Sequence, residues 1–176
     1  MITNQRSVLS DPAEMMFRVS KDAADRNPLQ LAMRRQELVL SRAQALAVGI
    51  TPDMLRHRAR AGGPWQRLLP GAYLTVTGTP TARQLEIAAL LYAGGESVLT
   101  GFAALRHHRI QVPETGPITV LIPAGHIRLS RAFVRVAPTT RMPVPVFARG
   151  AVTFAPPARA SPMRHASYAA SVKSGH

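Results

Sequence analysis

Hydrophobic positions in the N-terminal half of the chain recur at helical spacing before they change to short extended runs. Ala43, Leu46 and Ala47 repeat at the spacing of one helix face, and they follow Ser41, a residue type that caps helix N-termini. Gly49 suits the left-handed position that ends such a helix. The pattern therefore predicts a short helix from Ser41 to Gly49.

A second helix is predicted directly after this one. Thr51 can cap it, and Pro52 fits its first turn because a missing N–H costs nothing there. The negative charge of Asp53 suits the positive end of a helix. We expect this second helix to end at Gly62-Gly63.

The second predicted helix has one apolar and one polar side. At about 100° per residue, Leu55 and Ala59 share a face. The opposite arc carries four polar residues: Asp53, Arg56, His57 and Arg60. Two short helices joined by a glycine-containing turn describe a helix-turn-helix, whose second helix can enter a DNA major groove. A solvated surface gives the same pattern, so helical spacing alone leaves both interpretations open.

Two short strands are predicted after the glycines, over residues 65–69 and 72–76. Pro70-Gly71 between them is suited to a type II turn, and a winged helix places its β-ribbon at this point. We expect Trp65 to anchor the ribbon on the helices rather than to stack on bases. Arg58 lies nearer the apolar side of its helix, where its stem can cover apolar surface.

Five residues of this region are candidates for contact with DNA. We expect Arg56, His57 and Arg60 to contact it from the second helix, Arg42 from near the end of the first helix, and Arg67 from the ribbon. Arginine can pair with guanine in bidentate fashion, while phosphate contacts fix position without sequence specificity. For each arginine, exposure without base contact is the alternative.

The remaining pattern predicts three further helices and two more strands. Residues 28–38 form a helix that supports the helix-turn-helix, 81–93 form a core helix with a broad apolar face, and 97–108 form another helix. Residues 118–122 form a continuous apolar strand, and 132–136 form a strand that pairs with it.

These elements predict an α+β chain with an N-terminal winged helix-turn-helix and a small mixed α/β domain. We assign residues 1–32 to a flexible extension, 33–78 to the winged helix-turn-helix, 79–157 to the second domain and 158–176 to a polar, disordered tail. From Thr139 onward the sequence is rich in proline and poor in apolar periodicity.

Charge points to polyanionic partners. The chain has 22 Lys and Arg residues against 9 Asp and Glu, a formal net charge of +13, which predicts salt-dependent binding to nucleic acid. The absence of cysteine excludes a disulfide framework and a thiolate metal site. Since no apolar run suits a signal peptide or a membrane span, we expect a cytoplasmic protein without membrane contact.

Residues for catalysis or metal binding do not cluster in the sequence. His107 and His108 are adjacent, so on a helix their side chains point about 100° apart. A metal-dependent nuclease needs clustered carboxylates, and only two, Glu96 and Glu114, follow the first helix of the second domain. Neither a Walker-type phosphate loop nor a Ser, His and Asp set stands in a recognisable context. We expect no enzyme activity, no metal and no cofactor.

A resemblance to a known family covers about residues 34–157. It is carried by the run SRAQALAVGITPDMLRHRARAGGPWQRLLPGAYLTVTG, followed by AALLYAGGESVLTGFAALRHH and ITVLIP. It is most specific at Trp65, Leu69, Pro70, Gly71 and Tyr73. These segments resemble the AbiEi-type antitoxin family of type IV toxin–antitoxin systems, in the actinobacterial form with an N-terminal winged helix domain.

The resemblance implies a function and several partners. Family membership implies a transcriptional regulator that binds inverted repeats in double-stranded DNA and represses its own operon. Such repeated operators favour a homodimer or a cooperative pair. It also implies a C-terminal domain that neutralises a nucleotidyltransferase-type toxin. Family members continue past the equivalent of FAPPARA with an apolar helix, so we expect this chain to be truncated there.

Two alternatives remain at the level of sequence. In the first, the chain is a protein-interaction module that neutralises such a toxin without specific DNA binding, and the arginines form only a solvated shell. In the second, it is a degraded fragment that folds without a present function.

Overall fold

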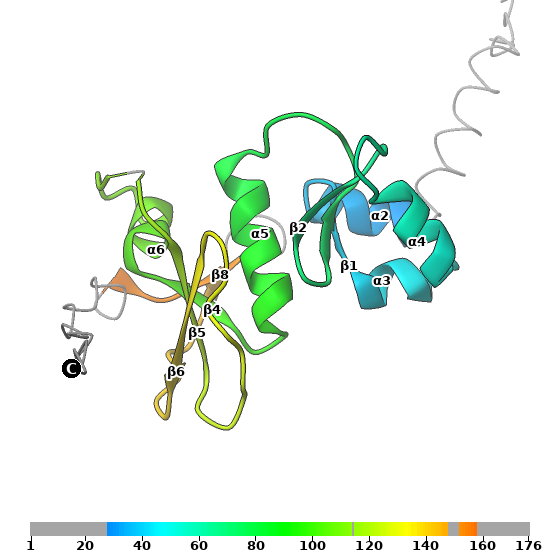
Figure 1. Ribbon diagram of the computed structural model, residues 1–176. Coiled ribbons are helices and arrows are strands. Elements are labelled where there is room, and N and C mark those ends of the chain that lie inside the picture. Colours follow the sequence, from blue (N-terminus) through cyan, green and yellow to red (C-terminus); the bar gives the residue numbers. More distant parts are fainter. Residues whose placement is uncertain (1–27, 114, 148–151, 158–176) are drawn as a thin grey trace, which may run out of the picture. The chain divides into compact units, whose positions relative to one another are not determined.

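The computed structural model describes residues 28–113, 115–147 and 152–157, which form an α+β fold with two sheets (Figure 1). The predicted α+β class is confirmed. The chain divides into two compact units between Tyr92 and Ala93, called here the N-terminal unit and the C-terminal unit. Residues 1–27 of the predicted extension and the predicted tail lie outside the described residues.

The N-terminal unit combines short helices with one antiparallel sheet. Its elements are, in order, α2 (Pro28–Arg35), β1 (Val39–Ser41), α3 (Arg42–Ala47), α4 (Pro52–Arg58), β2 (Gln66–Leu69), β3 (Ala72–Leu74) and α5 (Ala82–Ala93), whose last residue falls in the C-terminal unit. The strand order is β1-β3-β2. The predicted helices and both strands of the predicted ribbon are therefore present, with shifted ends.

Strand β1 was not expected from the sequence. The helix predicted over 28–38 ends at Arg35, and Glu37 and Leu38 adopt positive φ angles of 48° and 69°. This reversal directs Val39 into the sheet, where it lies opposite Leu74. Helix α2 includes residues 28–32, which the sequence assigned to the flexible extension.

Helix α5 begins at a reciprocal cap. The Thr81 backbone N–H donates to Gln84 Oε1 at 2.9 Å, and the Gln84 N–H donates to Thr81 Oγ1 at 3.2 Å. Arg83 Nε lies 2.6 Å from Glu37 Oε1, and this ion pair ties the start of the helix to the segment before β1. The core helix predicted over 81–93 is confirmed.

The C-terminal unit is built on a mixed five-stranded sheet. Its elements are β4 (Val98–Thr100), α6 (Gly101–His107), β5 (Ile118–Pro123), β6 (Val134–Thr139), β7 (Val146–Phe147) and β8 (Thr153–Phe154), with strand order β6-β5-β4-β8-β7. Strand β5 pairs antiparallel with β4 and parallel with β6. The predicted pairing of the strands near 118–122 and 132–136 is confirmed, although β6 starts at Val134 and runs to Thr139.

The helix predicted over 97–108 is wrong in its first part. Val98, Leu99 and Thr100 form the central strand β4 and are buried, so they show no alternation of apolar and polar residues. The helix starts only at Gly101, which has a φ of 63° and whose Cβ position would face Thr119 Oγ1 at 3.7 Å. A glycine at this corner lets the chain turn from strand to helix.

Residues after Thr139 contribute more order than the sequence indicated. Strands β7 and β8 complete the sheet, and Val152, Phe154 and Ala155 are buried. The His107 ring stacks on Phe154 with centroids 4.7 Å apart, and His108 Nε2 hydrogen-bonds the Ala155 carbonyl oxygen at 2.8 Å. The contacts of these two adjacent histidines therefore hold the segment of β8 against the end of α6.

Within the parts of the chain that the structure describes, no helix has the length and apolar character needed to cross a membrane.

Candidate nucleic-acid interface

Helix α3 starts at a capping box. Ser41 Oγ accepts from the Gln44 N–H at 3.1 Å, and Gln44 Oε1 accepts from the Ser41 N–H at 2.8 Å. The Arg42 N–H also donates to the Gly71 carbonyl at 2.8 Å, which joins the helix start to the β2–β3 turn. Arg42 was expected near the end of the first helix, but it is the first residue of α3, with an exposed side chain.

The turn between α3 and α4 follows the prediction. Gly49 has a φ of 86°, and the Ile50 N–H returns to the Ala45 carbonyl at 3.1 Å. Thr51 Oγ1 then accepts from the Met54 N–H at 3.2 Å and caps α4. Local chemistry thus sets where one helix ends and the next begins.

A hydrophobic cluster fixes α4 against the rest of the unit. Its buried members come from β1, α3, the turn, α4, the residue before β2, and β3: Leu40, Ala45, Ile50, Leu55, Trp65 and Tyr73. Ala59 packs against the cluster, as its helix face predicts. Trp65 is buried here, so its predicted anchoring role is confirmed.

Helix α4 ends at Arg58, one turn before the predicted end at Gly62-Gly63. The Arg58 carbonyl accepts from the Trp65 N–H at 3.0 Å. Gly63 crosses so close to this helix end that its Cβ position would lie 2.3 Å from the Arg58 carbonyl oxygen. The prediction that Arg60 belongs to the second helix is therefore wrong. Arg60 is an exposed residue of the turn that follows the helix.

The polar side of α4 is exposed as the sequence predicts. Arg56 and His57 are both exposed, whereas Leu55 beside them retains only 3% of its accessible surface. Arg56 Nη2 lies 2.5 Å from Asp53 Oδ1, and the two side chains are 78% and 81% exposed. An ion pair this exposed is worth at most about 1 kcal/mol, so a phosphate can compete for the arginine.

Arg67 lies on the helix-bearing side of the sheet. It stands opposite Tyr73 in the β2–β3 register, and Tyr73 stands opposite Leu40. Directly opposed residues share a face of the sheet, and both partners belong to the cluster beneath α3 and α4. Because β2 is an edge strand, the Arg67 side chain leaves this face at its margin and is exposed.

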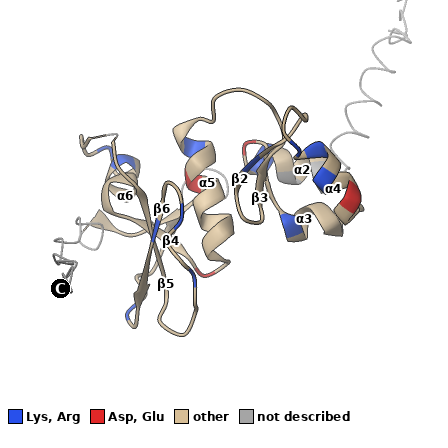
Figure 2. Ribbon diagram, viewed as in Figure 1, with Lys and Arg blue, Asp and Glu red and all other residues tan. Residues whose placement is uncertain are grey.

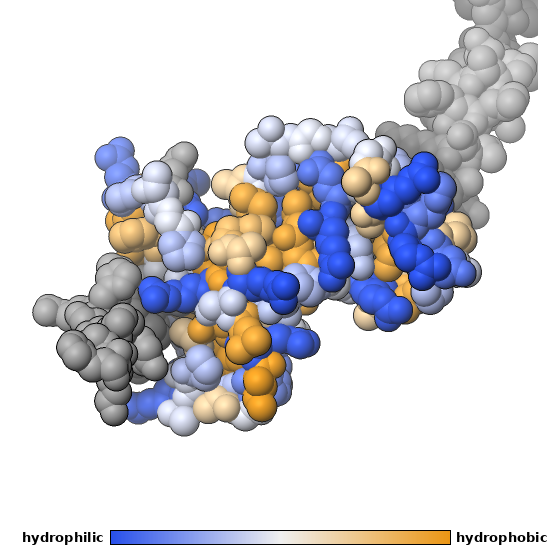
Figure 3. Space-filling model, in the orientation of Figure 1, coloured by the Kyte–Doolittle hydropathy of each residue, from blue (hydrophilic) through white to orange (hydrophobic). Residues whose placement is uncertain are grey.

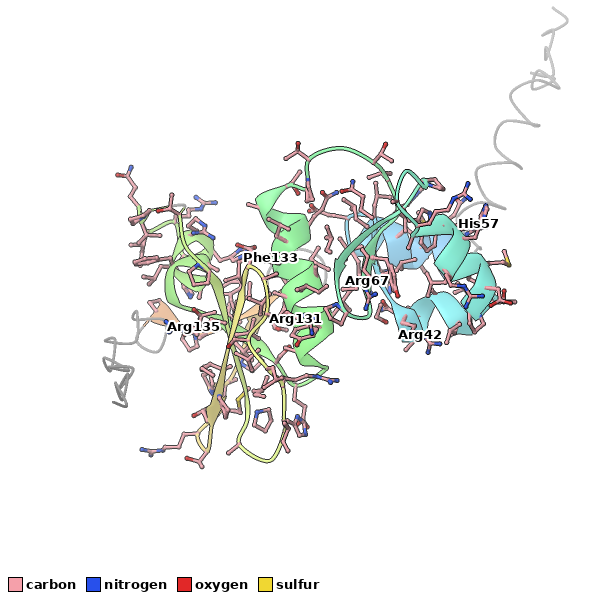
Figure 4. The ribbon with its side chains drawn as sticks, in the orientation of Figure 1. Arg42, His57, Arg67, Arg131, Phe133 and Arg135 are labelled. Carbon is pink, nitrogen blue, oxygen red and sulfur yellow. The ribbon has the colours of Figure 1, made fainter. Side chains whose placement is uncertain are left out.

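The cationic residues thus come from several elements of one unit. Figure 2 shows basic positions on α3, α4 and β2, and Figure 3 shows hydrophilic residues spread over the visible face of this unit. Figure 4 labels Arg42, His57 and Arg67 on these three elements. Residues 38–78 hold five arginines and one aspartate, a formal charge of +4 from 5 − 1. This surface is suited to a polyanion.

Two glutamines with positioning roles were not singled out in the sequence. Gln44 completes the capping box of α3, and its spacing from Ser41 is a readable signal. Gln66 Nε2 donates to the carbonyls of Val76 at 3.0 Å and Gly78 at 2.8 Å, which holds the chain after the ribbon. These partners are ten and twelve residues away, so no local pattern indicates them.

Metal ligands do not gather in the described parts of the chain: no group of three or more His, Asp or Glu side chains there could hold an ion.

Comparison with known proteins gives no assignment, since no protein-family model and no curated protein matches the sequence.

Proposed function

We propose that the N-terminal unit is a winged helix-turn-helix that binds double-stranded DNA in a sequence-specific manner. Two observations support this proposal. The elements follow one another as helix, strand, helix, helix and two-stranded ribbon, and the strands of the sheet are ordered β1-β3-β2. In this proposal α3 and α4 are the two helices of the motif, and the β2–β3 ribbon is the wing.

Helix α4 is the recognition helix in this proposal. The observation that carries it is the contrast between buried Leu55 and exposed Arg56 and His57 on one short helix. The apolar face is held by the cluster, so the polar face is presented in one orientation. Arg56 is suited to a bidentate contact with guanine, and Arg42, Arg60 and Arg67 are suited to phosphates.

The biological role that fits best is autorepression, as in the AbiEi-type antitoxins that the sequence resembles. A single DNA-binding module of this kind buries only about 600–1,000 Å² of protein surface. Two copies on an inverted repeat double this area and the number of phosphate contacts. We therefore propose that the chain acts as a homodimer on its operator.

Selectivity for DNA is tested by a titration of the full chain. A labelled duplex from upstream of its own gene is compared with a scrambled duplex of equal length and composition, at two salt concentrations. A regulator retains preference for its own duplex at the higher salt. Equal and salt-sensitive binding to both would contradict the proposal and favour the rival function, in which the C-terminal unit binds a nucleotidyltransferase-like toxin and charge alone attracts DNA.

A further inference from the structure

The connection between β5 and β6, residues 124–133, exposes two aliphatic side chains. Ile127 is 90% exposed and Leu129 is 74% exposed. Single exposed apolar residues are common on protein surfaces, but these two lie on either side of Arg128. His126, Arg128 and Arg131 are all exposed as well. The segment thus combines apolar tips with positive charge.

The base of this connection is held against the edge of the sheet. Ser130 Oγ accepts from the Val136 N–H at 3.0 Å. Arg131 and Val134 exchange two backbone hydrogen bonds, each of 2.9 Å. Ile127 and Leu129 are therefore presented by a segment whose end is fixed, which reduces the ordering cost of inserting them into a partner.

The same contacts close the edge of β6 to strand addition. The Phe133 carbonyl accepts from the Ile118 N–H, and the Thr139 carbonyl accepts from the Ala124 N–H. Alternate residues of a parallel strand bond the same neighbour, so the backbone N–H and C=O groups of residues 134, 136 and 138 face away from β5. The Val134 and Val136 N–H groups already donate within the connection, and Pro138 has none. An extended peptide cannot pair there, so a partner must contact the side chains of the connection.

Charge selects an anionic partner. Between residues 93 and 157 the described residues contain six arginines and one carboxylate, Glu96. Glu96 Oε2 lies 3.9 Å from His126 Nε2, so positive charge at the connection comes from Arg128 and Arg131. At this connection a second copy of the chain would present the same positive excess, so it is disfavoured as the occupant of this surface; the proposed homodimer would form elsewhere. A protein partner of usual affinity needs about 800 Å² of surface on each side. Two aliphatic side chains, with Arg128 between them and Arg131 two positions after them, fit a narrower target.

We propose that the connection is a DNA wedge: Ile127 and Leu129 enter the minor groove and part a base step, while Arg128 and Arg131 bind the flanking phosphates. Apolar residues that open a base step bend the duplex toward the major groove, and pyrimidine–purine steps open most readily. The inference rests on the proposed function, because the N-terminal unit of the same chain holds the duplex at high effective concentration.

The test is a bending measurement on the full chain. A duplex of about three helical turns carries a donor and an acceptor dye at its ends, in an own-operator and a scrambled version. Energy transfer is read at saturating protein. The wedge variant is Ile127→Ser with Leu129→Ser. The matched control is Val144→Ser, which changes an aliphatic residue of the same unit that is 84% exposed.

The wild-type chain and the control are expected to raise energy transfer on binding. The wedge variant is expected to leave the duplex straight and to bind roughly tenfold more weakly, with an unchanged salt slope because it removes no charge. Circular dichroism checks that the variant folds.

A wild-type complex that leaves the duplex straight, or a wedge variant that bends it fully, overturns the inference but not the proposed regulator. If this variant loses only binding to a nucleotidyltransferase-like toxin, the connection serves a protein partner and the wedge is again overturned. Bending of both duplexes without preference supports the wedge and overturns sequence-specific regulation. A chain that binds neither duplex overturns both proposals.

Discussion

The guanidinium carbon of Arg58 lies 5.2 Å from the centre of the Trp65 ring, at the junction between α4 and β2. The same two residues are joined by the backbone hydrogen bond from Trp65 to the Arg58 carbonyl. Arg58 therefore covers an aromatic residue of the cluster, whereas Arg56 on the same helix faces solvent. The two arginines of α4 therefore differ in role: Arg58 supports the fold, and Arg56 is available to a ligand.

Replacement of Arg58 with alanine is expected to lower stability rather than recognition. The lost cation–π contact is worth about 0.5–1 kcal/mol at a partly exposed site. Chemical denaturation measures the change, and Arg58→Lys should recover part of it because lysine can also lie over the ring. A loss of DNA affinity of about tenfold with unchanged stability would instead make Arg58 a DNA contact.

Gly63→Ala is expected to destabilise the N-terminal unit by about 1–3 kcal/mol, because the added methyl group must displace the end of α4. Gly95→Ala is the matched control, since nothing lies within 4 Å of its Cβ position and its φ is not positive. Thermal unfolding of both variants measures the difference. Equal melting temperatures for the two variants would show that α4 does not end against Gly63.

Asp53→Asn is expected to strengthen DNA binding by up to about 1 kcal/mol, because it releases Arg56 and removes a negative charge from the recognition surface. The same change should cost about 0.3–1 kcal/mol of stability through loss of charge at the helix N-terminus. Fluorescence anisotropy and denaturation measure the two effects. Asp53→Glu, which keeps the charge at this position, is the matched control, and an equal gain in affinity there would show that the removed charge is not the cause.

Local chemistry made much of the N-terminal unit predictable. Ser41 and Thr51 cap helices in the structure as their side chains and positions indicate. Gly71, with a φ of 81°, turns the ribbon where the sequence predicts. Each of these features depends on residues within a few positions along the chain, so a sequence pattern can reveal it.

The features that the sequence pattern did not predict depend on contacts beyond the local sequence. The end of α4 is set by Gly63 and Trp65 folding back, which moved Arg60 off the predicted helix. Strand β4 is buried throughout because it is central, so its pattern resembles that of a buried helix segment. Strand β8 has two residues and gains its order from pairing with β4.

The most direct test of the central claim compares Arg56→Ala with Arg60→Ala, as a double variant, against a charge-matched Arg135→Ala with Arg141→Ala. Anisotropy titrations with the own-operator and scrambled duplexes are run over a range of salt. We predict that the first variant loses at least about 1–3 kcal/mol of binding free energy on the own-operator duplex and loses its preference over the scrambled one. Its salt slope should be smaller by about 0.9, because Arg60 is the phosphate contact of the pair. The control variant should keep the preference. Unchanged affinity and selectivity in the Arg56 and Arg60 variant would contradict the assignment of this surface to DNA recognition.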